Sequence, residues 1–450
     1  MRFSDVCLVV GVMALLLSAG LGGGLGGERD GGPGETSSEM PSVGCSEDAL
    51  SETAEAASPV DDIRDWTIAV YWAGDNNLDP DTDTFISLWM QSLWNREDVA
   101  LSVFIDRSSF PANMSTLTEK GWTEITRYTE EVNSSSPSVL SDFMTYTLTD
   151  PALKADRYML MLLSHGLGYM GLCVDEGEPN RPWMPVDSLG SALDSSYTET
   201  GKRFDIVDID ACTMGCVEVA YELRDKAGYL VASQLAVPFD GINYRALLGG
   251  LSADSDVSPV DLACKMVEDY AEWYSAPLGT YPTLYPYMQD FATLSVVNLS
   301  LIGEVGRAFS QLSACMVQPE AKLMGPFKEA VRTSFVALWM NNMACGFYSD
   351  VQSLLEEFAS RVEGTHPTVA DACTEVIQAA CNAIEHSWAS ERLRDRMNGL
   401  SVFVPPGYGI FTASWDTLQR VYDTVGLDFV EQSGWGSVID MYCLPCKSLG

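Results

Sequence analysis

The feature that most constrains the fold of this chain is a series of short, almost wholly apolar runs separated by segments with helical spacing. These runs are Trp66–Trp72, Val99–Ile105, Tyr158–Leu163, Phe204–Ile209 and Tyr229–Ala232. Strands without polar alternation are typical of a parallel sheet, because the helices of its crossover connections cover both faces. The sequence therefore predicts an α/β fold with a mainly parallel central sheet between layers of helices.

The second half of the chain, from about residue 259 to residue 388, has a mainly helical pattern. Apolar residues recur every three to four positions in three segments, Leu301–Met316, Val351–Val362 and Val369–Trp388. The short apolar run Gly399–Pro405 is closed by two prolines and predicts a returning strand. We therefore expect helical insertions around the sheet and a helix-rich C-terminal region.

The N-terminal region predicts export. An apolar run from Val6 to Leu17 follows a weakly basic start, so residues 1–26 are predicted to be a signal peptide or an N-terminal anchor, with cleavage preferred. Residues 27–62 contain few large apolar side chains and are predicted to be a disordered acidic linker. One large domain over residues 63–405 and a helical tail over residues 406–450 complete the predicted organisation, with a secreted or cell-surface location.

The composition excludes some classes of function. The chain has 63 acidic and 26 basic residues, a formal net charge of −37 that disfavours nucleic acid and favours basic peptides. The alternative is that this charge only keeps an exported protein soluble. None of the three histidines has metal-ligand spacing to a cysteine pair, so Cys443 and Cys446 are predicted to form a disulfide or remain thiols rather than bind zinc.

Two of the predicted strands run directly into reactive side chains. Tyr158–Leu163 is followed by Ser164 and His165, and Phe204–Ile209 is followed by Asp210, Ala211 and Cys212. Because the carboxyl ends of parallel strands meet at one edge of a sheet, we expect the histidine and the cysteine to face each other. A thiolate beside a histidine attacks carbonyl carbon, so this pair indicates acyl transfer.

Neighbouring residues extend this hypothesis. A helix predicted over Met214–Arg224 would lower the pKa of the Cys212 thiol. The amides of Gly166 and Cys212 are candidates for holding a developing oxyanion. Cys216 is a rival nucleophile, but we expect it to lie one turn into the helix and away from the strand end. The alternative is that Cys212 is a small core residue and His165 a structural histidine.

Several segments together resemble the clostripain family of cysteine peptidases. Phe204–Leu223 resembles the family's nucleophile motif, an apolar strand followed by Asp-Ala-Cys-x-Met and Glu-x-Ala-Tyr-Glu-Leu, and Met161–Gly168 resembles its histidine motif. Other matches, in the family's order, are Trp72–Leu78, Tyr229–Ser233 and Gly399–Pro405. The resemblance implies a caspase-like three-layer sandwich over residues 63–405 that hydrolyses peptide bonds after Arg or Lys through a thioester acyl-enzyme.

The resemblance also implies roles for single residues. Cys212 becomes the nucleophile, and His165 the histidine that assists it or protonates the leaving amine. Asp210 lies in the motif beside the primary specificity pocket, and Asp240 falls where the family places a second carboxylate that would pair with a guanidinium. A turn-forming Asp-Gly is the alternative for Asp240. Gln234 departs from the family, which commonly has an acidic residue there.

The chemistry itself requires no cofactor, but the resemblance leaves calcium as a candidate, together with activation by cleavage between His165 and Cys212. The basic residues available there are Arg181, Lys202 and Arg203, and Pro182 makes the bond after Arg181 a poor site. The acidic run Asp75–Asp83 resembles a calcium loop but lacks its turn glycine and its final bidentate acid. A cluster at a helix N-terminus is the preferred interpretation of this run.

Two other functions remain open at this stage. One is a catalytically inactive surface protein that binds basic peptides through Asp210 and Asp240, and the other is a caspase-like peptidase of different specificity. In each case we expect peptides or proteins as partners, no nucleic acid, and membrane contact only through an N-terminal anchor.

Overall fold

The structure is a computed structural model that describes residues 63–277, 286–317, 322–339, 347–405 and 422–443. The predicted signal or anchor, the predicted linker, residues 406–421 of the predicted tail, and Cys446 lie outside these ranges. No helix among the described residues combines the length and apolar composition needed to cross a membrane.

A nine-stranded sheet forms the centre of the fold, in the order β10-β8-β7-β6-β5-β1-β2-β3-β4. The five strands from β7 to β2 are parallel, and an antiparallel pair extends each edge, which confirms the mainly parallel sheet. The strands are β1 (Arg64–Gly74), β2 (Val99–Arg107), β3 (Phe110–Thr118), β4 (Gly121–Arg127), β5 (Ala155–Leu163), β6 (Phe204–Asp210), β7 (Ala227–Ala232), β8 (Thr293–Asn298) and β10 (Ile384–Ala389).

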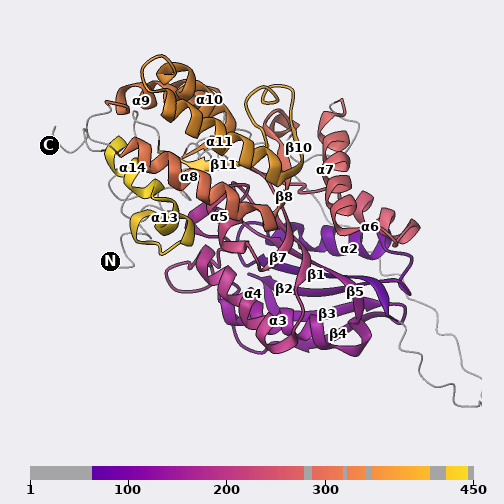
Figure 1. Cartoon of the computed structure of the whole chain (residues 1–450). Coiled ribbons are helices and arrows are strands. Elements are labelled where there is room, and N and C mark those ends of the chain that lie inside the picture. The colour runs from indigo at the N-terminus through magenta and orange to yellow at the C-terminus, as the bar shows by residue number, and fades with distance from the viewer. Residues whose placement is uncertain (1–62, 278–285, 318–321, 340–346, 406–421, 444–450) are drawn as a thin grey trace, which may run out of the picture.

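Helices cover both faces of this sheet (Figure 1). One face packs on α2 (Thr82–Ser92), α6 (Tyr244–Ala253) and α7 (Pro259–Ser275). The other packs on α3 (Pro137–Thr149), α4 (Val186–Thr200), α5 (Val217–Leu223) and α8 (Ile302–Met316). Successive residues of β1 point into opposite cores, which explains why its sequence is continuously apolar. The architecture is thus the three-layer, caspase-like sandwich.

The C-terminal half contains a strand that the sequence predicted as part of a helix. The predicted helix Val369–Trp388 ends at Ala383, because the next six residues form β10 and pair with β8. Strand pairing at the sheet edge therefore overrides the local periodicity. The hairpin of β3 and β4 was also not predicted. The returning strand is β11 (Ser401–Phe403), which pairs with β9 (Tyr348–Asp350) in a separate two-stranded sheet.

The remaining helices enclose the larger core beside α8. They are α9 (Met324–Trp339), α10 (Val351–Val362), α11 (Pro367–Ala383), α13 (Asp428–Ser433) and α14 (Trp435–Cys443). Trp435 is fully buried, and its ring centroid lies 5.1 Å from that of Phe309 and 5.9 Å from that of Phe327. Its indole N–H donates to the carbonyl of Phe403 at 3.1 Å. The last described helices therefore share the core of the sandwich.

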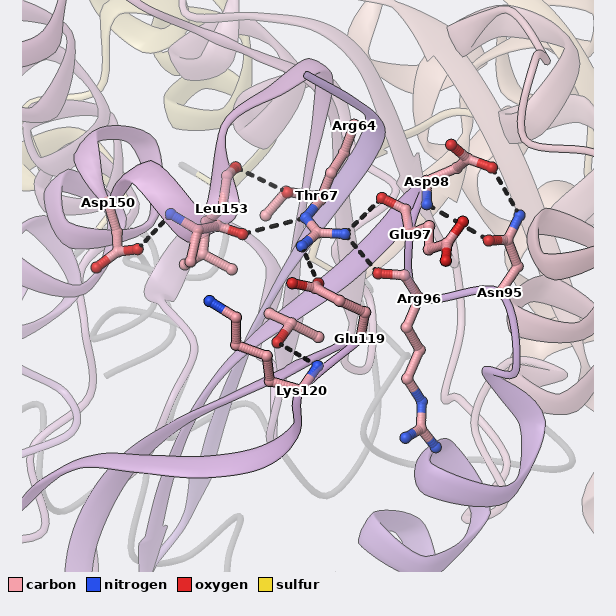
Figure 2. Close-up of polar contacts among 12 residues, drawn as sticks. Arg64, Thr67, Asn95, Arg96, Glu97, Asp98, Glu119, Lys120, Asp150 and Leu153 are labelled. Atoms are coloured by element: carbon pink, nitrogen blue, oxygen red, sulfur yellow. Dashed lines mark hydrogen bonds and ion pairs between the residues drawn. The ribbon is translucent and has the colours of Figure 1, made fainter. Parts of the chain in front are cut away.

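Arg64, the first residue of β1, joins three other segments (Figure 2). Its guanidinium donates to the carbonyl of Ala152 at 3.1 Å and to the carbonyls of Arg96 and Glu97, and it forms an ion pair with Glu119. Only 9% of Arg64 is exposed. One side chain thus connects β1 to the segments that precede β2 and β5 and to the turn between β3 and β4.

We expect Arg64→Met to lower the free energy of unfolding by about 2–3 kcal/mol, because several carbonyl acceptors would lose their donor. Urea denaturation followed by circular dichroism measures this change. The control is Arg127→Met, which removes an exposed ion pair with Glu124 and should have no measurable effect. Equal effects of the two substitutions would contradict the role of Arg64.

Candidate active site

The loops after β5 and β6 lie against each other. The two strands are parallel neighbours, with Leu163 opposite Asp210, and His165 and Cys212 each follow two residues beyond this pair. A Cβ added to Gly166 would lie 2.5 Å from the carbonyl oxygen of Cys212, closer than real Cβ contacts, so only glycine allows this approach. The structure therefore brings the loop of the histidine onto the backbone of the cysteine.

His165 is half-buried and held by the loop that follows β1. Its Nε2 lies 2.7 Å from Oδ1 of Asn77, and its carbonyl accepts a hydrogen bond from the amide of Cys173 at 3.1 Å. With Oδ1 as acceptor, Nε2 carries the proton and Nδ1 is the acceptor of the ring. Burial lowers the pKa of His165 to about 4, so the imidazole is neutral near pH 7.

Cys212 is also half-buried, and the expectation of a lowered thiol pKa was wrong for the free protein. The pKa of Cys212 is raised to about 11, mainly by burial and to a smaller extent by the charge of Asp210, against a lowering by a backbone hydrogen bond from Val237. The predicted helix starts late, because Thr213 adopts a positive φ of 63° and α5 begins only at Val217. A turn therefore separates the thiol from the helix N-terminus that was expected to stabilise its thiolate.

This turn is fixed by the segment after β7. The amide of Thr213 donates to the carbonyl of Leu235 at 2.9 Å, and the amide of Gly215 donates to the carbonyl of Ser233 at 2.7 Å. A positive φ at a β-branched residue is strained and persists only when its surroundings hold it. The two hydrogen bonds provide that support for the residue next to Cys212.

Cys216 is inaccessible, although not for the expected reason. It precedes α5 as its N-cap instead of lying one turn inside the helix. Its side chain is 0% exposed, and burial raises the pKa of its thiol well above the usual value. A bridge to Ser401 holds its backbone against β11. Substrate therefore has no route to this thiol in the described structure.

Asp210 lies under the loop that carries Asp240. Its carboxylate accepts hydrogen bonds from the amide of Ile242 at 3.1 Å and from the hydroxyl of Tyr244. Gly241 has a φ of +64°, and a Cβ there would lie 2.3 Å from Oδ2 of Asp210. The structure thus places the turn that carries Asp240 against the carboxylate of Asp210, whose charge acts on Cys212.

The turn interpretation of Asp240 also has support. The amide of Gly241 donates to the carbonyl of Pro238 at 2.9 Å, which closes a turn around Asp240. The hydroxyl of Tyr274 donates to the carbonyl of Gly241 at 2.7 Å and anchors this turn on α7. Asp240 is half-buried and lies within this anchored turn, which supports the turn interpretation.

The sequence analysis missed Asp208. This residue is 0% exposed, lies two positions before Asp210 on the same face of β6, and neither carboxylate oxygen has a hydrogen-bond partner among the described residues. Burial, and then the charge of Asp210, raise its pKa well above the usual value. The signal was present in the sequence, because an acid inside an apolar strand is unusual.

The sequence analysis also missed Asn77, which contacts His165, as a functional residue, although it lies in a segment that resembled the family.

The departure from the family at Gln234 has a structural explanation. Its amide donates to Oδ2 of Asp350 and to the hydroxyl of Ser401, each at 2.9 Å, and it accepts from the amide of Gly399 at 2.8 Å. Its polar atoms therefore join the end of β7 to the small sheet.

The acidic run Asp75–Asp83 does not converge on one point. Oδ1 of Asp79 accepts from Arg107 at 2.6 Å and its Oδ2 from Ser108 at 2.5 Å, while Asp83 pairs with the same arginine at 2.8 Å. The run opens a 3₁₀ turn and then α2, without a side-chain cap hydrogen bond. A different set of described carboxylates, Asp75, Glu131 and Asp175, is close enough to hold a metal ion.

Comparison with known proteins identifies similar chains. The model of the clostripain family, a family of C11 peptidases, matches residues 70–442. Clostripain from Hathewaya histolytica is 28% identical over 145 residues, which cover 29% of this chain and 27% of clostripain. The aligned part thus spans about a quarter of that relative's length.

Two solved structures have the same fold. A secreted C11 cysteine protease from Bacteroides thetaiotaomicron, bound to an irreversible peptide inhibitor, has a TM-score of 0.59 and 19% identity, covering 83% of this chain and 99% of its own. An inactive zymogen C11 protease from Parabacteroides distasonis also has a TM-score of 0.59, with 16% identity, and covers 82% and 98%. At these identities the likeness establishes the fold alone.

We expect alkylation of Cys212 by iodoacetamide to be slow at pH 7 and to accelerate about tenfold per pH unit toward pH 11, since only the thiolate reacts and the thiol pKa is raised. Mass spectrometry of the peptide that contains Cys212 measures the rate. Cys216→Ala is the control and should leave the profile unchanged. A rate that has already reached its plateau at pH 7 would show a thiolate stabilised by His165 instead.

Proposed function

The chain belongs to the clostripain family of cysteine peptidases, and from this premise we propose that it is a secreted endopeptidase that cleaves peptide bonds after Arg or Lys. The observation that carries the proposal is the contact between the loops of His165 and Cys212, with Asp210 beside the thiol. The apolar run at residues 6–17 supports export. A protein of similar fold from Bacteroides thetaiotaomicron is described as secreted.

Acyl transfer begins in this proposal from a neutral thiol and a neutral imidazole. Sγ of Cys212 attacks the carbonyl carbon, its proton passes to His165, and the oxyanion accepts hydrogen bonds from the amides of Gly166 and Cys212. His165 then gives the proton to the departing amine, which leaves a thioester. Water hydrolyses the thioester, releases the acid product and restores the thiol. No metal or organic cofactor takes part in these steps.

The substrate itself helps to ionise the thiol. In the free protein the charge of Asp210 opposes formation of a thiolate at Cys212. A cationic side chain that pairs with Asp210 neutralises this charge and removes that opposition. Binding energy from the side chain is thereby converted into reactivity at the neighbouring thiol, so a basic residue should affect the rate as well as the affinity.

The acidic corner supports the preference for a basic residue. Asp210 contacts the turn that carries Asp240, and the buried Asp208 lies two positions before Asp210 on the same face of β6. A guanidinium or ammonium group would pair with Asp210 and Asp240 by charge-assisted hydrogen bonds. The formal net charge of −37 would also attract basic peptides toward the surface.

We expect Cys212→Ala to lower turnover of fluorogenic peptides ending in Arg or Lys by at least about 10³-fold, because the nucleophile is lost. Cys216→Ala, the matched control, should retain activity because its thiol is buried. Initial rates with Arg, Lys, Asp and Asn peptides measure both effects.

The same assay separates the alternatives. Absence of turnover in every form, including after limited proteolysis and with calcium present, would favour an inactive protein that binds basic peptides. Preference for Asp or Asn would indicate a caspase-like peptidase of different specificity, with the nucleophile unchanged.

Asp210→Asn should lower kcat/KM for an Arg peptide by about 10- to 100-fold, the loss expected when a hydrogen bond to a charged partner becomes neutral. A fall in kcat should accompany the rise in KM if the cation also promotes thiolate formation. Asp371→Asn removes an exposed charge on α11 and is the matched control. Equal kinetics for both variants would exclude Asp210 from the specificity pocket.

A further inference from the structure

Three carboxylates from distant parts of the chain converge behind the loop of His165. Asp75, Glu131 and Asp175 each place an oxygen within 4.8 Å of the other two. Asp75 follows β1, Glu131 follows the β3–β4 hairpin, and Asp175 belongs to the loop after β5. Asp75 and Asp175 are buried, while Glu131 is exposed and opens the cluster to solvent.

A fourth carboxylate lies close to this cluster, because the hydroxyl of Ser134 hydrogen-bonds to both Asp106 and Asp175. Asp106, on β2, is 2% exposed, and its Oδ2 has no hydrogen-bond partner among the described residues. A buried carboxylate oxygen without a donor carries an energetic cost that a bound cation would remove.

The described surroundings do not balance this charge. Among the described residues, no Lys or Arg forms an ion pair with any of the four carboxylates. Neutral amides bind Asp175, with Ser134 donating to Oδ2 at 2.9 Å and Glu178 donating to Oδ1 at 3.1 Å. The carboxyl groups of Asp75 and Glu131 lie within hydrogen-bonding reach of each other, which requires either a shared proton or a cation.

We propose that Asp75, Glu131 and Asp175 bind one calcium ion, with Asp106 as a further carboxylate toward its buried side. The ligand set consists of oxygen atoms only, without His or Cys, which disfavours zinc and favours a hard divalent cation. Calcium accepts six to eight oxygens in flexible geometry, so water can complete a site that is open at Glu131. This site shares only Asp75 with the acidic run that resembled a calcium loop.

The site would position the catalytic histidine. Asp75 directly precedes Asn76, whose amide donates to the carbonyls of Ala73 and Val174 at 3.0 and 3.1 Å, and the next residue, Asn77, contacts His165. The carbonyl of Asp75 also accepts from the amide of Glu176 at 2.8 Å. An ion shared by the two loops would therefore fix the spacing between Asn77 and His165. This positioning role rests on the proposed function, whereas the binding of the ion does not.

The test measures binding without catalysis. Full-length Cys212→Ala protein is treated with EDTA, exchanged into metal-free buffer and titrated with calcium chloride in a calorimeter. We expect one site per chain and a melting temperature that rises with calcium, since a ligand that binds the folded state stabilises it. Glu131→Gln and Asp175→Asn should each weaken binding at least about tenfold.

Two variants, Glu131→Gln and Asp81→Asn, distinguish loss of the proposed site from misfolding and from a general loss of negative charge. Glu131 is exposed, so its replacement by Gln should not prevent folding, which circular dichroism checks. Asp81→Asn, the matched control, removes a carboxylate from the acidic run outside the cluster and should leave binding unchanged. Absence of calcium binding would mean that a shared proton neutralises the cluster, and the proposal would be wrong. Loss of binding in Asp81→Asn, or its retention in Glu131→Gln, would also overturn it.

In the active protein, the proposed positioning role predicts a calcium-dependent fall in KM or rise in kcat that Glu131→Gln abolishes. Calcium binding by the Cys212→Ala protein without peptidase activity in the parent would refute the proposed function and leave the metal site intact. Peptidase activity without calcium binding would refute the metal site and leave the proposed function intact.

Discussion

The candidate active site, with His165 and Cys212, lies where β5 and β6 end, and its geometry depends on the parallel pairing of these two strands. Both strands contribute side chains to the two cores, so a one-residue shift of register would send every side chain to the opposite core and disrupt its packing. The observed register sets Leu163 opposite Asp210, and this single pairing places His165 and Cys212 at equal distances beyond the sheet. The sheet core therefore sets where both loops begin, and neighbouring segments hold His165 and the turn of Cys212 in place.

Burial at this edge also explains the protonation states. Desolvation disfavours charge on His165 and on Cys212 alike, so it drives their pKa values in opposite directions, to about 4 and about 11. Carboxyl groups lie on either side of this edge, Asp208 with Asp210 and the cluster around Asp175, and most of them are shielded from water. The proposed basic side chain of the substrate and the proposed calcium ion would each stabilise one of these groups. Cation binding would then prepare the resting site for chemistry.

The sequence predicted the central strands because strands buried on both faces are apolar at almost every position, with Asp208 as an exception in β6. It could not predict β10, whose residues continue the helical spacing of α11 until pairing with β8 interrupts it. The late start of α5 depends on the positive φ of Thr213, which neighbouring hydrogen bonds impose. The acid cluster draws on residues about 100 positions apart, Asp75 and Asp175, so no local motif could indicate it.

The position of the nucleophile also depends on the C-terminal half of the chain. The amide of Ser401 donates to the carbonyl of Gly215 at 3.0 Å, so β11 supports the turn that carries Cys212. Gln234 ties the segment on the other side of this turn to Ser401 and to Asp350, which is fully enclosed by hydrogen-bond donors from Ser353 and Asn398 as well. An acidic residue in place of Gln234 would set a second buried carboxylate against Asp350 and repel it. The departure from the family at Gln234 therefore fits the architecture of the turn, and it leaves the acidic corner to Asp210 and Asp240.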